Sequence, residues 1–320
     1  MANNNYGIWA LAINLLLLPI FKSILLWYFS DWSPKLVFSI SSLKRHLSFG
    51  SRLLIIGVFD KIVSNFESLL IGKYYSKIEL GYFSQARKLN SYVVETSSIV
   101  LQRVTYPLLS KLGDNKAELK NGYRKVIEVS MFVIFPTMFF IYISSENIII
   151  SLFGEKWLDS AKYLRLWSIC GLVITLYSFF INIFLVLSKT NLLLIISIIR
   201  QVLRLVMLFF VLKMDVISIL YGITIVTIIS GIIYIYIGGK FINYTFKEVF
   251  FDIKYILIFS ILSSIITYFI GKYFILESNT LKLFIQIFSM TFMYFSLSMI
   301  FNSKPLLEVK FLLSNILGKK

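Results

Sequence analysis

The chain has 320 residues, of which 58% are hydrophobic and 15% are charged, and its mean hydropathy is +0.81. Soluble domains are about 45–50% apolar and about 25% charged, so this composition indicates a polytopic membrane protein. The net charge of +16 fits cytoplasmic loops beside anionic lipid better than a nucleic-acid surface, and one cysteine with one histidine excludes a disulfide framework or a Cys/His metal cluster.

Nine segments are predicted to span the membrane, because a spanning helix needs about 20 mostly apolar residues. They are residues 6–29, 52–74, 80–109, 126–145, 163–187, 191–212, 216–238, 254–271 and 281–302. The second, third and sixth contain ionisable residues and are expected to score poorly on hydropathy alone. The apolar runs are continuous and do not alternate, so the predicted fold class is an all-α helix bundle with about nine transmembrane helices.

The distribution of lysine and arginine predicts the orientation. Nine spans put the two ends of the chain on opposite sides, and the loops on the side of the C-terminus carry far more basic residues. The positive-inside rule therefore predicts a cytoplasmic C-terminus and an external N-terminus. No basic region precedes the first apolar run, which argues against a signal peptide. An uncharged external N-terminus leads us to expect that preceding helices are missing.

Two loops stand out between the spans. Residues 30–51 carry the basic run 44–46 among alternating apolar residues, which predicts a linker plus an interfacial helix on the cytoplasmic leaflet. This segment is the predicted boundary between two helix groups. The largest predicted outer loop is Glu146–Lys162, with Trp157 placed to anchor at the membrane interface.

Polar side chains form stripes on three of the spans. Asp60, Ser64 and Glu67 share one face of the second span, with Lys61 beside them, and Arg200 and Arg204 lie one turn apart on the sixth. The stripe of the third span comprises Ser84, Lys88, Ser91, Glu95, Ser98, Gln102 and Thr105. Arg200 lies about 13 Å into its span at 1.5 Å per residue, which is too deep for an interfacial position. The three stripes together predict a hydrated pocket.

The residue types in these stripes suggest two kinds of ligand. Arginine matches phosphate oxygens with two parallel hydrogen bonds, so the cationic members fit an anion. The acidic members fit a proton or sodium site, or they neutralise the arginines. A purely structural pairing of Arg200 and Arg204 with Glu95 or Glu67 stays open. Arg87 is expected to snorkel to the outer interface.

Enzymatic signatures are weak. The sequence contains neither a P-loop nor a dinucleotide-binding glycine motif, and its carboxylate pairs in loops are isolated. We therefore expect no catalytic residues, no bound metal and no cofactor. A charged cavity without an ATP site favours a secondary transporter coupled to a proton or sodium gradient.

Six segments of the chain together carry a family resemblance, and they are residues 7–11, 32–35, 65–73, 80–86, 106–112 and 153–157. These segments are similar to the Wzx-type polysaccharide flippases, which belong to the multidrug/oligosaccharidyl-lipid/polysaccharide exporter superfamily. The similarity covers about residues 6–240, and no single motif carries it. Glu67 stands where relatives commonly have Asp, which keeps the charge.

The resemblance implies one six-helix lobe of a two-lobe exporter fold. On this reading residues 1–29 form the last helix of an N-terminal lobe, 30–51 the linker, and 52–240 a complete C-terminal lobe. Residues 241–302 then form two additional transmembrane helices, and 303–320 a cytoplasmic tail. The first five helices of the fold have no counterpart, so the chain is expected to be a fragment, a truncated product or half of a split pair whose partner supplies them.

The resemblance also implies a function in the bacterial inner membrane: flipping of undecaprenyl-diphosphate-linked oligosaccharide for O-antigen, capsule or exopolysaccharide synthesis, by ion-coupled alternating access. The expected partners are this polyprenyl-diphosphate-linked substrate and membrane lipid, and no nucleic acid. Arg200, Arg204, Lys61 and Lys88 are the candidate substrate contacts. Asp60, Glu67 and Glu95 are the candidates for ion coupling. A multidrug/cation antiporter of the same superfamily, a polysaccharide polymerase and an inactive remnant are the alternatives.

Overall fold

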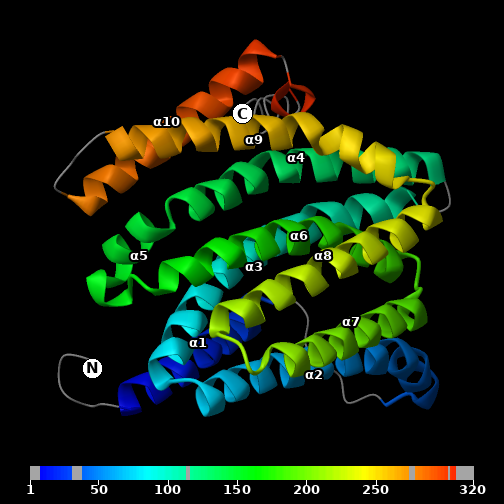
Figure 1. The fold of residues 1–320 in the computed structure, drawn as a ribbon. Helices are drawn as coiled ribbons and strands as arrows, with labels where there is room; N and C mark the ends of the chain where they lie inside the picture. The colour runs from blue at the N-terminus through cyan, green and yellow to red at the C-terminus, as the bar shows by residue number, and fades with distance from the viewer. Residues whose placement is uncertain (1–7, 31–37, 113–115, 274–277, 302, 308–320) are drawn as a thin grey trace. The chain divides into compact units, whose positions relative to one another are not determined.

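A computed structural model describes residues 8–30, 38–112, 116–273, 278–301 and 303–307, and the elements in these ranges are all helices (Figure 1). They are α1 (Ile8–Phe29), α2 (Ile40–Tyr74), α3 (Lys77–Leu112), α4 (Lys116–Ile143), α5 (Ser145–Phe153), the 3₁₀ turn η2 (Glu155–Trp157), α6 (Ser160–Val186), α7 (Thr190–Val211), α8 (Val216–Phe241), α9 (Phe246–Tyr273) and α10 (Asn279–Ile300). The predicted all-α fold class is confirmed.

The chain divides into two compact units, residues 1–48 and residues 49–320. The first contains α1 and the start of α2. Its predicted linker differs from the structure after Ile40, because α2 continues from there as one unbroken helix to Tyr74. Residues 31–37 of that linker and 308–320 of the predicted tail lie outside the described residues. The five-part domain assignment stays a prediction.

Six of the described helices, α4 and α6 to α10, are long and apolar enough to cross a membrane. Helices α2 and α3 are longer, with 35 and 36 residues, but polar positions interrupt them, as the sequence predicts. The expectation for the sixth predicted span is wrong: α7 passes on hydropathy, because Arg200 and Arg204 are its only ionisable residues. The chain is a multi-pass membrane protein.

The predicted outer loop Glu146–Lys162 is largely helical. Helix α5 and the turn η2 fill most of it, and α6 begins at Ser160. The ring of Trp157 packs edge-on against that of Tyr82, with 5.9 Å between ring centroids, so an aromatic contact ties this segment to α3.

Helix α6 lies at the centre of the second unit and packs against α3, α4 and α8 (Figure 1). Large side chains of this core, including Tyr123, Phe180 and Phe184, are fully buried. A glycine is needed where α8 ends, because a Cβ atom at Gly239 would lie 2.2 Å from the main-chain oxygen of Tyr244. Tyr244 lies in the turn between α8 and α9, and its main-chain N–H donates a 2.9 Å hydrogen bond to the Gly239 oxygen, so the chain turns back tightly at this point.

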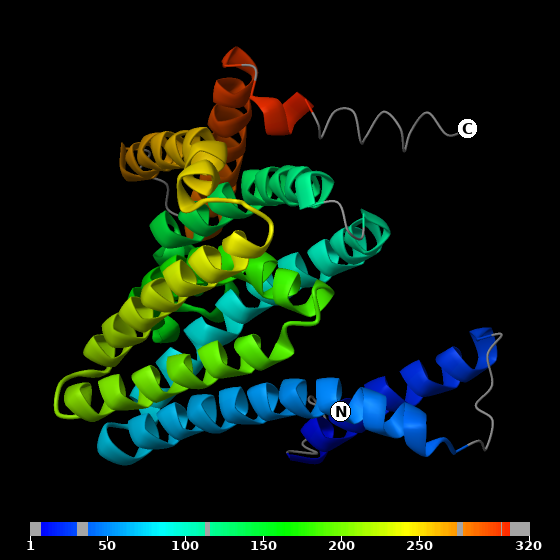
Figure 2. The same ribbon diagram turned by 90° about the vertical axis from the view of Figure 1, so that its right-hand side faces the viewer.

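Helix α9 packs along both α4 and α10 (Figures 1 and 2). Two ion pairs, one turn apart on each helix, join α4 to α9: Lys120 Nζ lies 2.6 Å from Glu248 Oε1, and Arg124 Nη2 lies 2.6 Å from Asp252 Oδ1. The α4–α9 contact therefore combines apolar packing with two charge pairs at one end.

Candidate functional site

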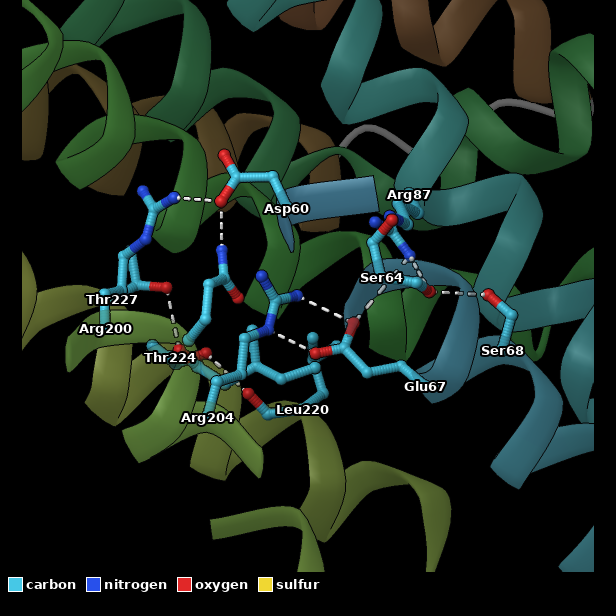
Figure 3. Close-up of polar contacts among 12 residues, drawn as sticks. Asp60, Ser64, Glu67, Ser68, Arg87, Arg200, Arg204, Leu220, Thr224 and Thr227 are labelled. Atoms are coloured by element: carbon cyan, nitrogen blue, oxygen red, sulfur yellow. Dashed lines mark hydrogen bonds and ion pairs between the residues drawn. The ribbon is translucent and has the colours of Figure 1, made fainter. Parts of the chain in front are cut away.

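A charged cluster joins α2 to α7 and α3 (Figure 3). Asp60 and Glu67 lie two turns apart on α2, and Arg200 and Arg204 lie one turn apart on α7. Arg200 Nη2 donates to Asp60 Oδ1 at 2.7 Å, and Arg204 Nη2 donates to Glu67 Oε2 at 2.7 Å. The two predicted stripes thus meet, and each arginine has its own carboxylate.

Glu67 is the most enclosed member of this cluster, with a side chain that is 0% exposed. Both of its oxygens contact Arg204, through Nη2 and Nε, and Arg87 Nη1 lies 3.8 Å from Oε2. A buried carboxylate needs such partners, because desolvation of an unpaired charge is very unfavourable. The sequence left open a pairing of the two arginines with Glu95 or Glu67. In the structure Arg204 pairs with Glu67, whereas Arg200 pairs with Asp60.

The Asp60 end of the cluster is more open, because the Asp60 side chain is 41% exposed. Gln201 also donates a hydrogen bond to Asp60 Oδ1 from the next position on α7. Arg200 Nη1 donates to the hydroxyl of Tyr177 at 3.2 Å, and its guanidinium carbon lies 6.0 Å from the centre of the Tyr234 ring. Two stacked tyrosines from α6 and α8 therefore hold Arg200 in place.

Arg87 of α3 is the third cation of the cluster, and the expectation that it snorkels to the outer interface is wrong. Arg87 Nη1 donates to the main-chain oxygen of Ser64 at 3.3 Å, and the guanidinium carbon lies 5.6 Å from the centre of the Trp167 ring. Its side chain is 27% exposed, compared with 14% for Arg200 and 18% for Arg204. Arg87 is thus the most accessible of the three arginines.

The structure does not bring the other predicted site residues into this cluster. Lys61, Lys88 and Glu95 are exposed side chains on α2 and α3. Lys88 Nζ lies 6.0 Å from the centre of the Tyr92 ring, and within the part of the chain that the structure describes no ion pair joins these three residues to the cluster. Ser98, Gln102 and Thr105 of the α3 stripe lie outside the described side chains.

Sequence reasoning missed Arg87 and Gln201. A signal for Arg87 was present, because it lies one turn before Ser91 and so borders the polar stripe of α3. Gln201 follows Arg200 directly, but spacing alone does not show that its amide reaches Asp60 on another helix.

Three guanidinium groups surround two carboxylates, so the cluster carries one net positive charge. Because guanidinium groups bind phosphate and carboxylate in the same forked geometry, an arginine can exchange one for the other. The cluster is therefore suited to an anion that approaches from the Arg87 or Asp60 side.

The comparisons with known proteins agree with this membrane architecture. The family described as polysaccharide biosynthesis protein matches residues 1–162. The teichuronic acid biosynthesis protein TuaB of Bacillus subtilis (strain 168) is 27% identical over 169 residues, which are 52% of this chain and 35% of that protein. The lipopolysaccharide biosynthesis protein WzxC of Escherichia coli (strain K12) is 24% identical over 154 residues, 48% of this chain and 31% of that protein.

The chain thus covers about a third of the length of these two relatives. Among solved structures, the lipid II flippase MurJ in an inward closed conformation is similar, with a TM-score of 0.65 and 18% sequence identity. That similarity covers 83% of this chain and 56% of MurJ, and it shows the fold. The resemblance to the Wzx-type flippases is confirmed by these matches.

Proposed function

Because the chain belongs to the polysaccharide biosynthesis protein family, whose match covers half of its residues, we propose that it takes part in flipping lipid-linked oligosaccharide. The substrate we propose is an oligosaccharide on undecaprenyl diphosphate, which moves from the inner to the outer leaflet of a bacterial inner membrane. The product then enters O-antigen, capsule or exopolysaccharide synthesis. The names of the two curated relatives refer to cell-surface polysaccharides and support this substrate class.

The observation that carries the proposal is the net positive cluster of Arg87, Arg200 and Arg204. A diphosphate must cross about 30 Å of hydrocarbon, and an uncompensated charge there is very unfavourable. Arginines that are already held by carboxylates and aromatic rings lower this barrier, because they supply fixed hydrogen-bond donors in place of water. An excess positive charge also disfavours a cationic drug as the substrate.

Within the cluster we assign the first phosphate contact to Arg87. It is the most exposed arginine, and its 3.8 Å distance to Glu67 is longer than the 2.7 Å contacts of Arg200 and Arg204. Arg204 and Arg200 would follow by exchanging a carboxylate for a phosphate oxygen. Lys61 and Lys88 are exposed on α2 and α3 and would attract the anion on its way in.

Ion coupling is a further part of the proposal. Asp60 is 41% exposed, so a proton or sodium ion can reach it more easily than the enclosed Glu67. Glu95, exposed on α3, is the third candidate. We propose that alternating access moves this lobe against a second lobe, with the N-terminus external and the C-terminus cytoplasmic.

The test replaces each of the three arginines by glutamine in the bacterium that carries the gene. A charge-assisted hydrogen bond contributes about 1.5–3 kcal/mol, so surface polysaccharide per molecule of membrane-inserted protein should fall by about tenfold or more. Dividing by the protein level separates this loss from the destabilisation that an unpaired, buried Glu67 causes in Arg204→Gln. Replacement by lysine should restore part of the signal at Arg87, where a single cation suffices. Lys213→Gln, an exposed lysine between α7 and α8, is the matched control. Wild-type polysaccharide in all three variants would overturn the proposal.

A further inference from the structure

A second polar site lies where the α2–α3 turn, the start of α6 and the α7–α8 turn meet. A cavity of about 320 Å³ opens there, and we call it the α7–α8 pocket. Its lining includes Tyr75, Glu79, Lys162, Tyr163 and Asp215. None of these residues belongs to the charged cluster of α2, α3 and α7. The volume is within the range of about 300–1,000 Å³ that is usual for small-molecule sites.

Hydrogen bonds fix the walls of the α7–α8 pocket. The Tyr163 hydroxyl donates to Glu79 Oε2, and the Tyr75 hydroxyl donates to the main-chain oxygen of Leu212 at 3.1 Å. Asp215 Oδ1 accepts two hydrogen bonds from the first turn of α8. The pocket therefore has its shape before any ligand enters, which lowers the entropy cost of binding.

Two charged groups of the pocket have unused hydrogen-bonding capacity. Both bonds from α8 go to Asp215 Oδ1, so within the described part of the chain no other residue donates to Asp215 Oδ2. Lys162 Nζ lies 3.8 Å from Glu79 Oε1, beyond hydrogen-bond distance, and its side chain is 41% exposed. The pKa of Asp215 is lowered mainly by the Ser218 hydroxyl and to a smaller degree by the charge of Lys162, so the two charged groups face the same space.

These free groups indicate the chemical class of the ligand. A free acceptor beside free donors fits a ligand whose groups both donate and accept, and hydroxyl groups do both. Val216 and Ile217 add apolar surface to the same pocket. A sugar ring presents hydroxyls at its rim and C–H groups on its faces, so it matches this combination of polar and apolar surface.

The pocket and the charged cluster lie on the same two helices. Tyr75 follows Glu67 by eight positions at the end of α2, and Glu79 precedes Arg87 by eight positions at the start of α3. Eight residues of helix span about 12 Å at 1.5 Å per residue. The α7–α8 pocket is therefore about two turns from the arginine that we assign to the first phosphate contact, toward the α2–α3 turn.

A column of aromatic rings also joins the two sites. The Phe83 ring lies 6.2 Å from the Tyr163 ring and 5.7 Å from the Trp167 ring, measured between centroids. Trp167 in turn contacts the guanidinium group of Arg87. The same contacts between α3 and α6 therefore position both the pocket and Arg87, so one elongated ligand can reach both.

We propose that the α7–α8 pocket binds a sugar unit of the lipid-linked oligosaccharide while its diphosphate contacts Arg87. Asp215 Oδ2 accepts from one hydroxyl of this sugar, Lys162 donates to another, and a face of the ring lies on Val216 and Ile217. The inference rests on the flipping function proposed above and adds a sugar-recognition site to it. In the orientation proposed there, this end of the lobe is the outer one, so the sugar lies ahead of the diphosphate on the way to the outer leaflet.

The test compares two probes on the purified full chain in detergent. One is undecaprenyl diphosphate, and the other is the undecaprenyl-diphosphate-linked oligosaccharide extracted from the bacterium that carries the gene. Microscale thermophoresis gives the dissociation constants. One hydrogen bond to a charged group corresponds to about tenfold in affinity, so the wild type should bind the glycosylated probe at least about tenfold more tightly than the bare one.

Two substitutions assign the sugar contacts. Asp215→Asn keeps the oxygen that caps α8 but replaces the free acceptor by a donor, and Lys162→Gln removes the ammonium group. Each should weaken binding of the glycosylated probe by about tenfold and leave binding of bare undecaprenyl diphosphate unchanged. Asp159→Asn and Lys213→Gln, the same changes at exposed positions outside the pocket lining, are the matched controls.

Arg87→Gln separates the sugar site from the phosphate site, because it should weaken both probes by the same factor. Equal affinity of the wild type for the two probes would overturn the sugar site but not the flipping proposal, and so would folded pocket variants that keep the wild-type preference. If neither pocket variant folds, the preference of the wild type decides. Binding of neither probe by the wild type would overturn the proposed function and this inference with it.

Discussion

The hydroxyl of Tyr294 on α10 donates a 2.9 Å hydrogen bond to the main-chain oxygen of Phe132 on α4. Pro136 lies four residues after Phe132 within the same helix and has no N–H to offer that oxygen. In hydrocarbon an unpaired main-chain oxygen is costly, so Tyr294 replaces the hydrogen bond that the proline removes. This contact joins α10 to α4.

Tyr294→Phe should therefore lower the free energy of unfolding by about 1–3 kcal/mol, the cost of a buried group that loses its partner. In a Pro136→Ala background the alanine N–H can bond to Phe132, so the same change should cost less. Thermal unfolding in detergent, followed by tryptophan fluorescence, measures both differences. Tyr221→Phe, at an exposed ring, is the control. An equal loss in both backgrounds would contradict this account.

Glu67→Gln should destabilise the protein by about 3 kcal/mol, because it leaves Arg204 and Arg87 without their shared carboxylate. Adding Arg204→Gln should recover part of this loss, since a neutral pair needs less compensation than a single buried charge. Chemical unfolding of Glu67→Gln, Arg204→Gln and the double variant gives the coupling energy between the two residues. Glu95→Gln, exposed on α3, should change stability by less than about 0.5 kcal/mol. Additive losses would show that the pair does not act as a unit.

Asp215, the residue before α8, should give the protein a pH-dependent contribution to stability. Its side chain accepts hydrogen bonds from the Ser218 hydroxyl and from the Ser218 main-chain N–H, and the first of these is the main cause that lowers the pKa of the carboxyl. A group with a lowered pKa stabilises the fold above its unfolded value of about 3.9, and this contribution is lost as the pH falls through the folded pKa.

Asp215→Ala should thus cost about 1 kcal/mol at pH 7, as loss of a helix N-cap does. The difference from the wild type should begin to shrink below about pH 3.9, the unfolded value, and should keep falling as the pH approaches the lowered pKa of the folded carboxyl. Asp215→Asn keeps a capping oxygen, so it should retain most of the stability but lose this pH dependence. Melting temperatures between pH 3 and pH 7 test both statements. A constant gap between wild type and Asp215→Ala across this range would argue against the cap.

Two glycines should respond to alanine in opposite directions. Gly239→Ala forces a Cβ against the main-chain oxygen of Tyr244, 2.2 Å away, and should destabilise by about 1–3 kcal/mol. Gly57→Ala in α2 meets no atom within 4 Å and should stabilise by about 0.5–1 kcal/mol through helix propensity. The same melting assay compares the two. A loss of stability at Gly57 would show that an unseen neighbour packs there.

The polar faces of the candidate site could be predicted from sequence, because helical spacing alone puts Asp60 with Glu67 and Arg200 with Arg204. The choice of partners could not. Arg200 meets Asp60 and Arg204 meets Glu67 only because α2 and α7 lie in a particular register, which tertiary packing sets. The environment of Arg87 was predicted wrongly for the same reason. Its position along α3 suggested a contact with lipid headgroups, but its partner Glu67 lies on α2.

Most helices of the fold were predicted from continuous apolar runs, but their ends were not. Helix α4 begins at Lys116, ten residues before the apolar run that predicted it. Its first turns carry Lys120 and Arg124, whose partners on α9 lie 128 positions further along the chain. Hydropathy shows which part of a helix contacts lipid. It does not show that the helix extends further into polar residues, because that extension is stabilised by ion pairs with residues far away in the sequence.

Those two ion pairs also fix the axial alignment of α9 on α4. Sliding α9 by a single turn would set Lys120 against Asp252 and Arg124 against the apolar Ile256, with Glu248 left over. Only one alignment satisfies all four charges, whereas the apolar surfaces of two long helices would accept several. The two ion pairs therefore select one axial alignment of α9 on α4 from several that apolar packing alone would allow.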